Sequence, residues 1–415
     1  MPAEPYSFTF YTASWYRRSP YWQRTVEAGC TSWDLYNHML IPTLYDDDEK
    51  EYWHLLEHVT LWDVAVERQV EITGPDAAAF TQLLTCRDLS ECEVLQCKYA
   101  PIIAPTGGIV NDPILLRLAE DHFWLSLADS DALLYALGVQ AFAKMDVTIR
   151  EPDVSPLQVQ GPKSKDVIRT LFGDAVAELR YYRCWEGDLD GMPVVVSRTG
   201  WSGEVGYEIY LRDGSKGIEL WDRVMEAGTP QNIRAIAPSD QRRLEAGIFN
   251  YGNDMTVEDT PFHVTGMERL VEFDAEFIGK EALQKVAAEG VDRKLVGVKI
   301  GGEPFRMWLE DFWPVERAGH PQMDRRAPGL GRYGLARHGG PGATRHAALP
   351  HAVRGLAAGR QGPRGRCPDR GVLPRVRGLR GHHRGAGAAR VAKGAPRVGV
   401  ANRCYPPREN PGSRP

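Results

Sequence analysis

The sequence predicts an α+β protein assembled from small units of strands and helices. A strand, a Gly-Pro turn and a helix follow one another over residues 66–85, and the same order recurs over residues 155–173. The two Gly-Pro pairs lie 87 residues apart. Short alternating strands joined by glycine-rich turns complete the pattern, as over residues 194–211. We therefore expect two related α+β units.

The boundaries of these elements follow from residues with local conformational effects. Pro75 stands near the first turn of one helix, where its missing N–H is tolerated, and the charge of Asp76 favours that helix end. Gly173 closes the second helix. Further elements are a strand, a glycine-rich turn and a strand over 194–211, a helix over 215–228, and a helix over 238–252 that Ser239 or Asp240 caps.

The turn "GWSG", Gly200 to Gly203, resembles the nucleophile elbow of serine hydrolases but is one residue short of it. An elbow requires a strand before the serine and a helix after it. Here "YEIYL" follows with strand alternation, and Glu204 stands where the second elbow glycine belongs. Ser202 is therefore not expected to be a nucleophile.

Charge is distributed unevenly along the 415 residues. Residues 321–415 hold 19 Arg, one Lys, two Asp and one Glu, whereas the remainder carries 30 basic and 52 acidic side chains. The basic segment contains no Phe, Trp or Ile and shows no strand or helix period. We interpret it as a G·C-rich message translated out of frame. A nucleic-acid-binding arm and a generic disordered tail are the alternatives.

The composition of the whole chain, with 43% hydrophobic and 25% charged residues, is ordinary for a globular protein. No apolar run approaches the length of a membrane span, and no signal peptide is evident. Seven cysteines without regular spacing indicate reduced thiols and a cytoplasmic location, and they do not favour a metal site. We expect neither a membrane nor a nucleic-acid partner. The oligomeric state is left open.

Asp112 and Glu208 are the first candidates for chemistry. Asp112 lies in "VNDPI", where Pro113 interrupts a strand and frees the backbone to bulge. Its carboxylate either faces a cavity, caps a turn or pairs with an arginine. Glu208 lies in a strand after the glycine-rich turn, where it would accept hydrogen bonds from an amidine-like heterocycle edge or face water.

For the other candidate site residues, a purely structural role is as plain an interpretation as a functional one. Arg243 and Glu245 in "RRLEAG" read as an ordinary surface pair on a helix, and "YNHM" at 36–39 reads as core. Aromatic side chains near the interesting turns would hold a cationic substrate by cation–π attraction, or would simply be core. These are Trp33, Tyr36, Trp185, Trp201 and Tyr207.

Taken together, these stretches resemble the folate-dependent aminomethyltransferase family, which includes the T-protein of glycine cleavage. The matching pieces occur in family order over residues 60–300. They are "ITGPDA", "GGIVNDPI", "VQGPKS", "SRTGWSGEVGYEIYL", "RRLEAGIFNYGNDM" and "FIGKEAL". A narrower likeness to the dimethylsulfoniopropionate demethylase branch is carried by "YNHMLIPT", "YWHLLEHVTLWDVAVERQVEI", "TCRDLS", "QCKYAPII" and "LSLADSD".

The resemblance implies a fold and a set of site residues. The fold would be small ferredoxin-like α/β domains around a folate site over residues 1–290. A C-terminal β-barrel would start at 291–319, and the basic segment 320–415 would leave it truncated or scrambled. Asp112 matches the family's catalytic aspartate. Tetrahydrofolate would contact Glu208, Tyr207, Arg243 and Trp201. The substrate would contact Tyr36, Trp185 and Tyr207.

The implied activity is transfer of a methyl group from a small sulfonium donor, such as dimethylsulfoniopropionate, to tetrahydrofolate. One alternative is an aminomethyltransferase of glycine-cleavage type, or a demethylase of glycine betaine or dimethylglycine. Another is a folate-binding protein without catalysis. The Lys-Gly-Cys motif of the non-catalytic relatives is not found.

Overall fold

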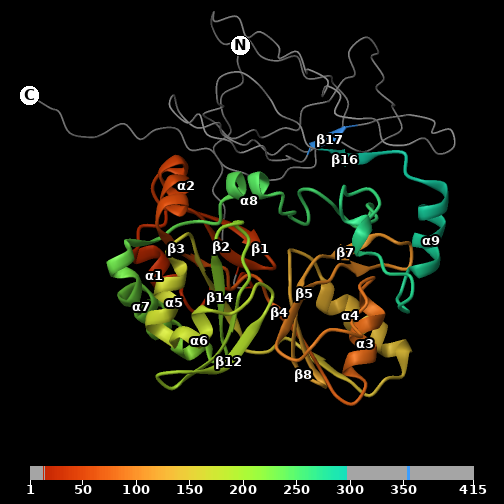
Figure 1. Cartoon of the computed structure of the whole chain (residues 1–415), viewed down its shortest axis with the longest axis horizontal. Coiled ribbons are helices and arrows are strands. Elements are labelled where there is room, and N and C mark those ends of the chain that lie inside the picture. Colours follow the sequence, from red (N-terminus) through yellow and green to blue (C-terminus); the bar gives the residue numbers. More distant parts are fainter. Residues whose placement is uncertain (1–12, 14, 297–352, 356–415) are drawn as a thin grey trace, which may run out of the picture.

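The computed structural model describes residue 13, residues 15–296 and residues 353–355. Expectations for the barrel beyond Val296 and for the basic segment therefore lie almost entirely outside the described residues. Within them, the chain forms two large sheets, each with helices on one side (Figure 1). The α+β class predicted from the sequence is confirmed. The domain boundaries stay a prediction.

One sheet contains five strands, and all of its neighbouring strands are antiparallel. In spatial order they are β10 (Thr148–Arg150), β4 (Gln69–Thr73), β9 (His122–Ser126), β8 (Ile114–Ala119) and β5 (Gln96–Tyr99). Helices α3 (Ala77–Leu84) and α4 (Ala132–Ala143) contact this sheet and cover its outer face (Figure 1).

The other sheet contains six strands, of which only β15 runs parallel to its neighbour. In order they are β12 (Cys184–Leu189), β13 (Met192–Ser197), β14 (Gly206–Leu211), β11 (Ser155–Gln160), β3 (Val59–Asp63) and β15 (Ile233–Ala235). The helices on this side are α1 (Trp22–Glu27), α5 (Ser164–Phe172), α6 (Asp174–Ala177) and α7 (Gly217–Gly228).

The smaller elements border the two sheets. Three two-stranded sheets are β1 (Ser32–Tyr36) with β2 (Met39–Leu44), β6 (Ile102–Ile103) with β7 (Ile109–Asn111), and β16 (Lys294–Val296) with β17 (Val353–Gly355). The remaining helices are α2 (Asp48–Glu57), α8 (Asp240–Ala246) and α9 (Lys280–Glu289). Helix α8 begins at the predicted Ser239 cap but ends earlier than predicted, because Gly247 adopts a left-handed conformation.

Both predicted repeats are confirmed as strand, Gly-Pro turn and helix. The first consists of β4 and α3, and the second of β11 and α5. They belong to different sheets, so the sequence repeat corresponds to the two halves of the fold.

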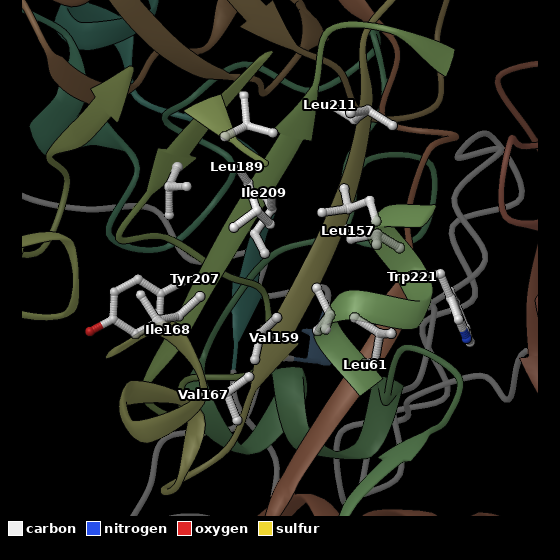
Figure 2. Close-up of a cluster of buried hydrophobic side chains, with 14 of the residues drawn as sticks. Leu61, Leu157, Val159, Val167, Ile168, Leu189, Tyr207, Ile209, Leu211 and Trp221 are labelled. Atoms are coloured by element: carbon white, nitrogen blue, oxygen red, sulfur yellow. The ribbon is translucent and has the colours of Figure 1, made fainter. Parts of the chain in front are cut away.

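Alternation along the strands creates an apolar core on each side of the six-stranded sheet. Tyr207, Ile209 and Leu211 belong to the apolar cluster on the helix-covered side, which also contains Val167 of α5 (Figure 2). The intervening Tyr210 faces the other sheet and packs near Trp124, with ring centroids 6.2 Å apart. The two sheets therefore pack face to face, with helices outside both.

No helix among the described residues is long and apolar enough to cross a membrane.

Candidate active site

Asp112 lies at the predicted break in the strand. Strand β7 ends at Asn111 and β8 begins at Ile114, so the Asp-Pro pair forms the interruption. The buried Asn111 amide holds this bend by donating to the carbonyl of Ala128 and the hydroxyl of Ser130, each at 2.8 Å. The bend leaves the Asp112 side chain only 8% exposed.

One Asp112 oxygen lacks a hydrogen-bond partner. The Tyr99 hydroxyl donates to Oδ2 at 2.8 Å, whereas Oδ1 is buried and has no partner among the described residues. Burial raises the pKa of Asp112 to about 7, and the negative charge of Asp254 adds to the effect. The hydrogen bond from Tyr99 and the positive charge of Arg243 oppose it. A buried acceptor with a pKa near neutrality suits a group that orients or deprotonates an amine.

Arg243 is a buried residue and not a member of a surface pair. Its guanidinium donates to Asp240 at 2.7 Å and to Asp254 at 2.5 Å, and it is 3% exposed. It lies 5.3 Å from the centroid of the Trp201 ring, whose Nε1 donates to the Phe249 carbonyl at 3.1 Å. The surface-pair interpretation was wrong because α8 packs this face inward. The structure thus brings Arg243 and Trp201 together near Asp112.

Glu208 lies on β14 facing the other sheet, and it is 3% exposed. Its Oε1 accepts a hydrogen bond from Gln158 Nε2 at 2.6 Å. Its Oε2 accepts from the hydroxyls of Tyr210, Ser197 and Thr199. These contacts exclude the alternative of a carboxylate facing water. They fix the orientation of the Glu208 side chain. Oε1 accepts one of these hydrogen bonds and Oε2 accepts three, so Oε1 has more capacity left for a ligand.

A second carboxylate, which the sequence analysis missed, contacts the same amide. Gln158 Nε2 also donates to Glu67 Oε1 at 3.2 Å. Glu67 lies where the chain crosses from β3 of the six-stranded sheet to β4 of the five-stranded sheet. Local sequence carries no signal of such a pairing, because Glu67 lies in the crossover segment and Gln158 in a distant strand, and only the folded chain brings them together.

The glycine-rich turn serves the packing of Gln160. A Cβ atom at Gly206 would lie 2.2 Å from Gln160 Oε1, and one at Gly200 would lie 2.3 Å from its Nε2. That amide in turn accepts a hydrogen bond from the fully buried Ser202 hydroxyl at 2.6 Å. Strand β14 follows the turn, so the prediction that Ser202 is not at a nucleophile elbow is confirmed.

Tyr36 is affected by the charges of both Asp112 and Glu67. It ends β1 and is partly exposed. Burial raises its pKa well above the usual value, and the nearby charges of Glu67 and Asp112 raise it further. Tyr36 therefore lies within electrostatic reach of both carboxylates.

The other two predicted aromatics lie on the far side of the six-stranded sheet. Tyr207 points into the core beneath α5, and its hydroxyl donates to the Ala177 carbonyl (Figure 2). Trp185 packs against the same core, with its ring centroid 5.8 Å from that of Phe172. The structure does not bring either residue together with Asp112 or Glu208, and their predicted roles stay predictions. Tyr210 shares the face of Glu208 instead.

Comparison with known proteins finds relatives over most of the chain. Residues 10–275 match the model of the GCVT N-terminal domain family. The chain is 42% identical over 299 residues to the dimethylsulfoniopropionate demethylase DmdA of Ruegeria pomeroyi, covering 72% of this chain and 81% of the relative. It is 31% identical over 291 residues to an aminomethyltransferase of Desulfitobacterium hafniense, covering 68% and 79% respectively.

A solved structure shows the same fold. The glycine cleavage system aminomethyltransferase T of Bartonella henselae superposes with a TM-score of 0.59 at 24% identity, covering 68% of this chain and 78% of that one. The expected one-carbon transferase class is confirmed by these relatives. The chain belongs to the GCVT family of aminomethyltransferases and their demethylase relatives.

Proposed function

We propose that this protein is a tetrahydrofolate-dependent demethylase that takes a methyl group from a small sulfonium compound, with dimethylsulfoniopropionate as the first candidate. The observation that carries the proposal is the 42% identity to a dimethylsulfoniopropionate demethylase across 72% of this chain. The orphaned Oδ1 of Asp112 and the free Gln158 Oε1 support it, because both are buried polar atoms that a ligand would satisfy.

The residues present fit a folate. Tetrahydrofolate, when bound, supplies the amine that accepts the methyl group. Glu208 Oε1 would hold the donor edge of the pterin, in an orientation fixed by Gln158. Asp112 Oδ1 would orient the amine or stabilise nearby positive charge. Arg243 would act through Asp112, since its charge lowers the pKa of that carboxyl.

Catalysis in this arrangement depends mainly on position. A sulfonium donor leaves as a neutral thioether, so the enzyme has little leaving-group charge to stabilise. Holding the two reactants in line supplies up to about 7–11 kcal/mol in ideal cases. The face-to-face sheets provide the rigid frame that such positioning needs.

A second candidate is aminomethyl transfer of the glycine-cleavage type. The 31% identity to an aminomethyltransferase over 68% of this chain favours it. Asp112 would then assist ring closure of a methylene unit, and the product would be methylene-tetrahydrofolate.

Mass spectrometry of the folate product separates the candidates. The protein is incubated with tetrahydrofolate and, separately, with dimethylsulfoniopropionate, glycine betaine and dimethylglycine. We expect methyl-tetrahydrofolate with dimethylsulfoniopropionate, because the thioether released from a sulfonium is a better leaving group than the amines released from the other two donors. A methyl group cannot become a methylene unit without an oxidant, so a further incubation offers an aminomethyl donor of the glycine-cleavage type. Methylene-tetrahydrofolate from that donor would move the protein to the aminomethyl branch. Folate binding without product would leave a folate-binding protein without catalysis.

The partners expected for this activity are small molecules. A cytoplasmic location accords with the five cysteines of the described residues, all of which are free thiols.

A further inference from the structure

Glu67 and Glu208 form a carboxylate pair between the two sheets. Both accept a hydrogen bond from the same nitrogen, Gln158 Nε2, at 3.2 Å and 2.6 Å. Ser126 on β9 donates to the other Glu67 oxygen at 3.5 Å. The carboxylate pair therefore links the segment that crosses between the two large sheets to strands of each sheet.

The pair lacks a positive partner. Arg68, which follows Glu67 in the chain, pairs with Glu151 through its Nη2, although its Nε has no partner among the described residues. Neither Glu67 nor Glu208 forms an ion pair with a described basic residue. Two carboxylates in low dielectric without a cation are unfavourable, so the site is electrostatically suited to a bound positive charge.

The surroundings of Glu67 also fit a small cation with methyl groups. Glu67 is partly exposed, in contrast to the buried Glu208. The Tyr210 hydroxyl donates to Glu208 Oε2 at 2.7 Å, so one phenol lies beside the carboxylate pair. The negative charge of Glu67 contributes to the raised pKa values of Tyr36 and Tyr210. Gln158 Oε1 is buried without a partner at the same point. Methylated cations are recognised by aromatic side chains with a nearby carboxylate.

We propose that Glu67 is the anionic contact for the positively charged centre of the methyl donor, a sulfonium or quaternary ammonium group. Glu67 thereby selects the cationic donor over the neutral product. Glu208 is left to the folate. The proposal rests on the proposed demethylation for the chemical class of the cation, and it adds a specificity-determining residue to that reaction.

Binding of the cation changes the protonation of Glu67. Burial raises the pKa of Glu67 well above its usual value, and the negative charge of Glu208 raises it further. The titratable groups facing it are Glu208, Tyr36 and Tyr210, and the pKa values of both tyrosines are raised well above their usual value, so neither phenol ionises near neutral pH. A cation placed beside Glu67 favours the ionised form, and the displaced proton goes to the buffer.

Calorimetry with two ligands of the same shape tests this role. Dimethylsulfoniopropionate carries the sulfonium, and 4-methylpentanoate has a neutral carbon in its place. The wild-type protein should bind the cation more tightly than the neutral isostere. Glu67→Gln should reduce this preference about 10- to 100-fold, because it removes a charge-assisted contact. Glu67→Asp keeps the charge and should retain part of the preference.

The controls separate a local effect from a general one. Glu226→Gln on α7 removes an exposed carboxylate and should leave the preference unchanged. At a pH below the raised pKa of Glu67, binding of the cation by the wild-type protein should release protons, measured in buffers of different ionisation enthalpy. The isostere should release none, and neither ligand should release protons from Glu67→Gln.

The outcomes that overturn the proposal are also distinct. An unchanged preference in Glu67→Gln, or a loss of tetrahydrofolate binding in place of cation binding, would show that Glu67 is not the cation contact. Equal binding of both ligands by the wild-type protein would have the same meaning. Failure of the proposed function appears elsewhere, as absence of methyl-tetrahydrofolate from a wild-type protein that still prefers the cation.

Discussion

At the scale of single residues, Asp112 combines a cost to stability with a gain for chemistry. Asp112→Asn should lower kcat by about 10²–10⁴-fold, since an amide cannot accept a proton in place of the carboxylate. Tetrahydrofolate binding should largely survive, because Glu208 is untouched. In the wild-type protein, kcat/KM should rise with pH through about 7 as Asp112 ionises. Turnover assays across pH and folate titrations measure these effects.

The same group makes a prediction for stability. The folded-state pKa of Asp112 is raised from 3.8 to about 7, so between these values the unfolded chain has released a proton that the folded chain keeps. The free energy of unfolding therefore falls as pH rises through this window, by up to roughly 4 kcal/mol from this residue. Asp112→Asn should be more stable than wild type in urea unfolding above pH 7. Unchanged turnover in the variant would mean that Asp112 has no catalytic role.

At the scale of elements, the Gly-Pro turns join each strand closely to a neighbouring segment. Gly161 has a φ of +120°, and a Cβ there would lie 2.6 Å from the His58 carbonyl oxygen. Gly161→Ala should therefore lower the free energy of unfolding by about 1–3 kcal/mol. The measurement is the midpoint of chemical denaturation.

Gly138 in α4 provides the matched control. It is exposed, and a Cβ there would contact nothing within 4 Å. Gly138→Ala should be neutral or stabilising by up to about 1 kcal/mol, because alanine favours helix more than glycine does. If both alanine variants behaved alike, close backbone approach would not explain the glycine at 161.

At the scale of the whole molecule, the two sheets should unfold as one unit because their facing surfaces share a core. Trp124 is fully buried there beside Tyr210, and its Nε1 donates to Glu71 at 3.1 Å. Trp124→Ala should cost about 3–5 kcal/mol and should shift one cooperative transition. Trp124→Phe should lose less. Two separated transitions in urea, followed by hydrogen exchange of each sheet, would show that the halves are independent.

Much of this molecule could be predicted from local patterns. Pro113 predicted the interrupted strand, the Gly-Pro pairs predicted two strand-to-helix junctions, and Ser239 predicted the start of α8. The end of α8 at Gly247 is a local glycine signal that the longer predicted helix overlooked. The inward position of Arg243 depends instead on how the helix packs, which a single sequence does not contain.

The sequence by itself determined the α+β class, the repeated strand-to-helix unit, the family and the candidates Asp112 and Glu208. These depend on local conformation and on residue order, which the chain carries directly. Only the tertiary structure decided which side chains share a site. It turned Tyr207 away from Glu208, because neighbouring residues of a strand point to opposite faces, and it joined Glu67 to Glu208 through Gln158. Such a pairing arises only when the crossover segment folds against strands that are far away in the chain.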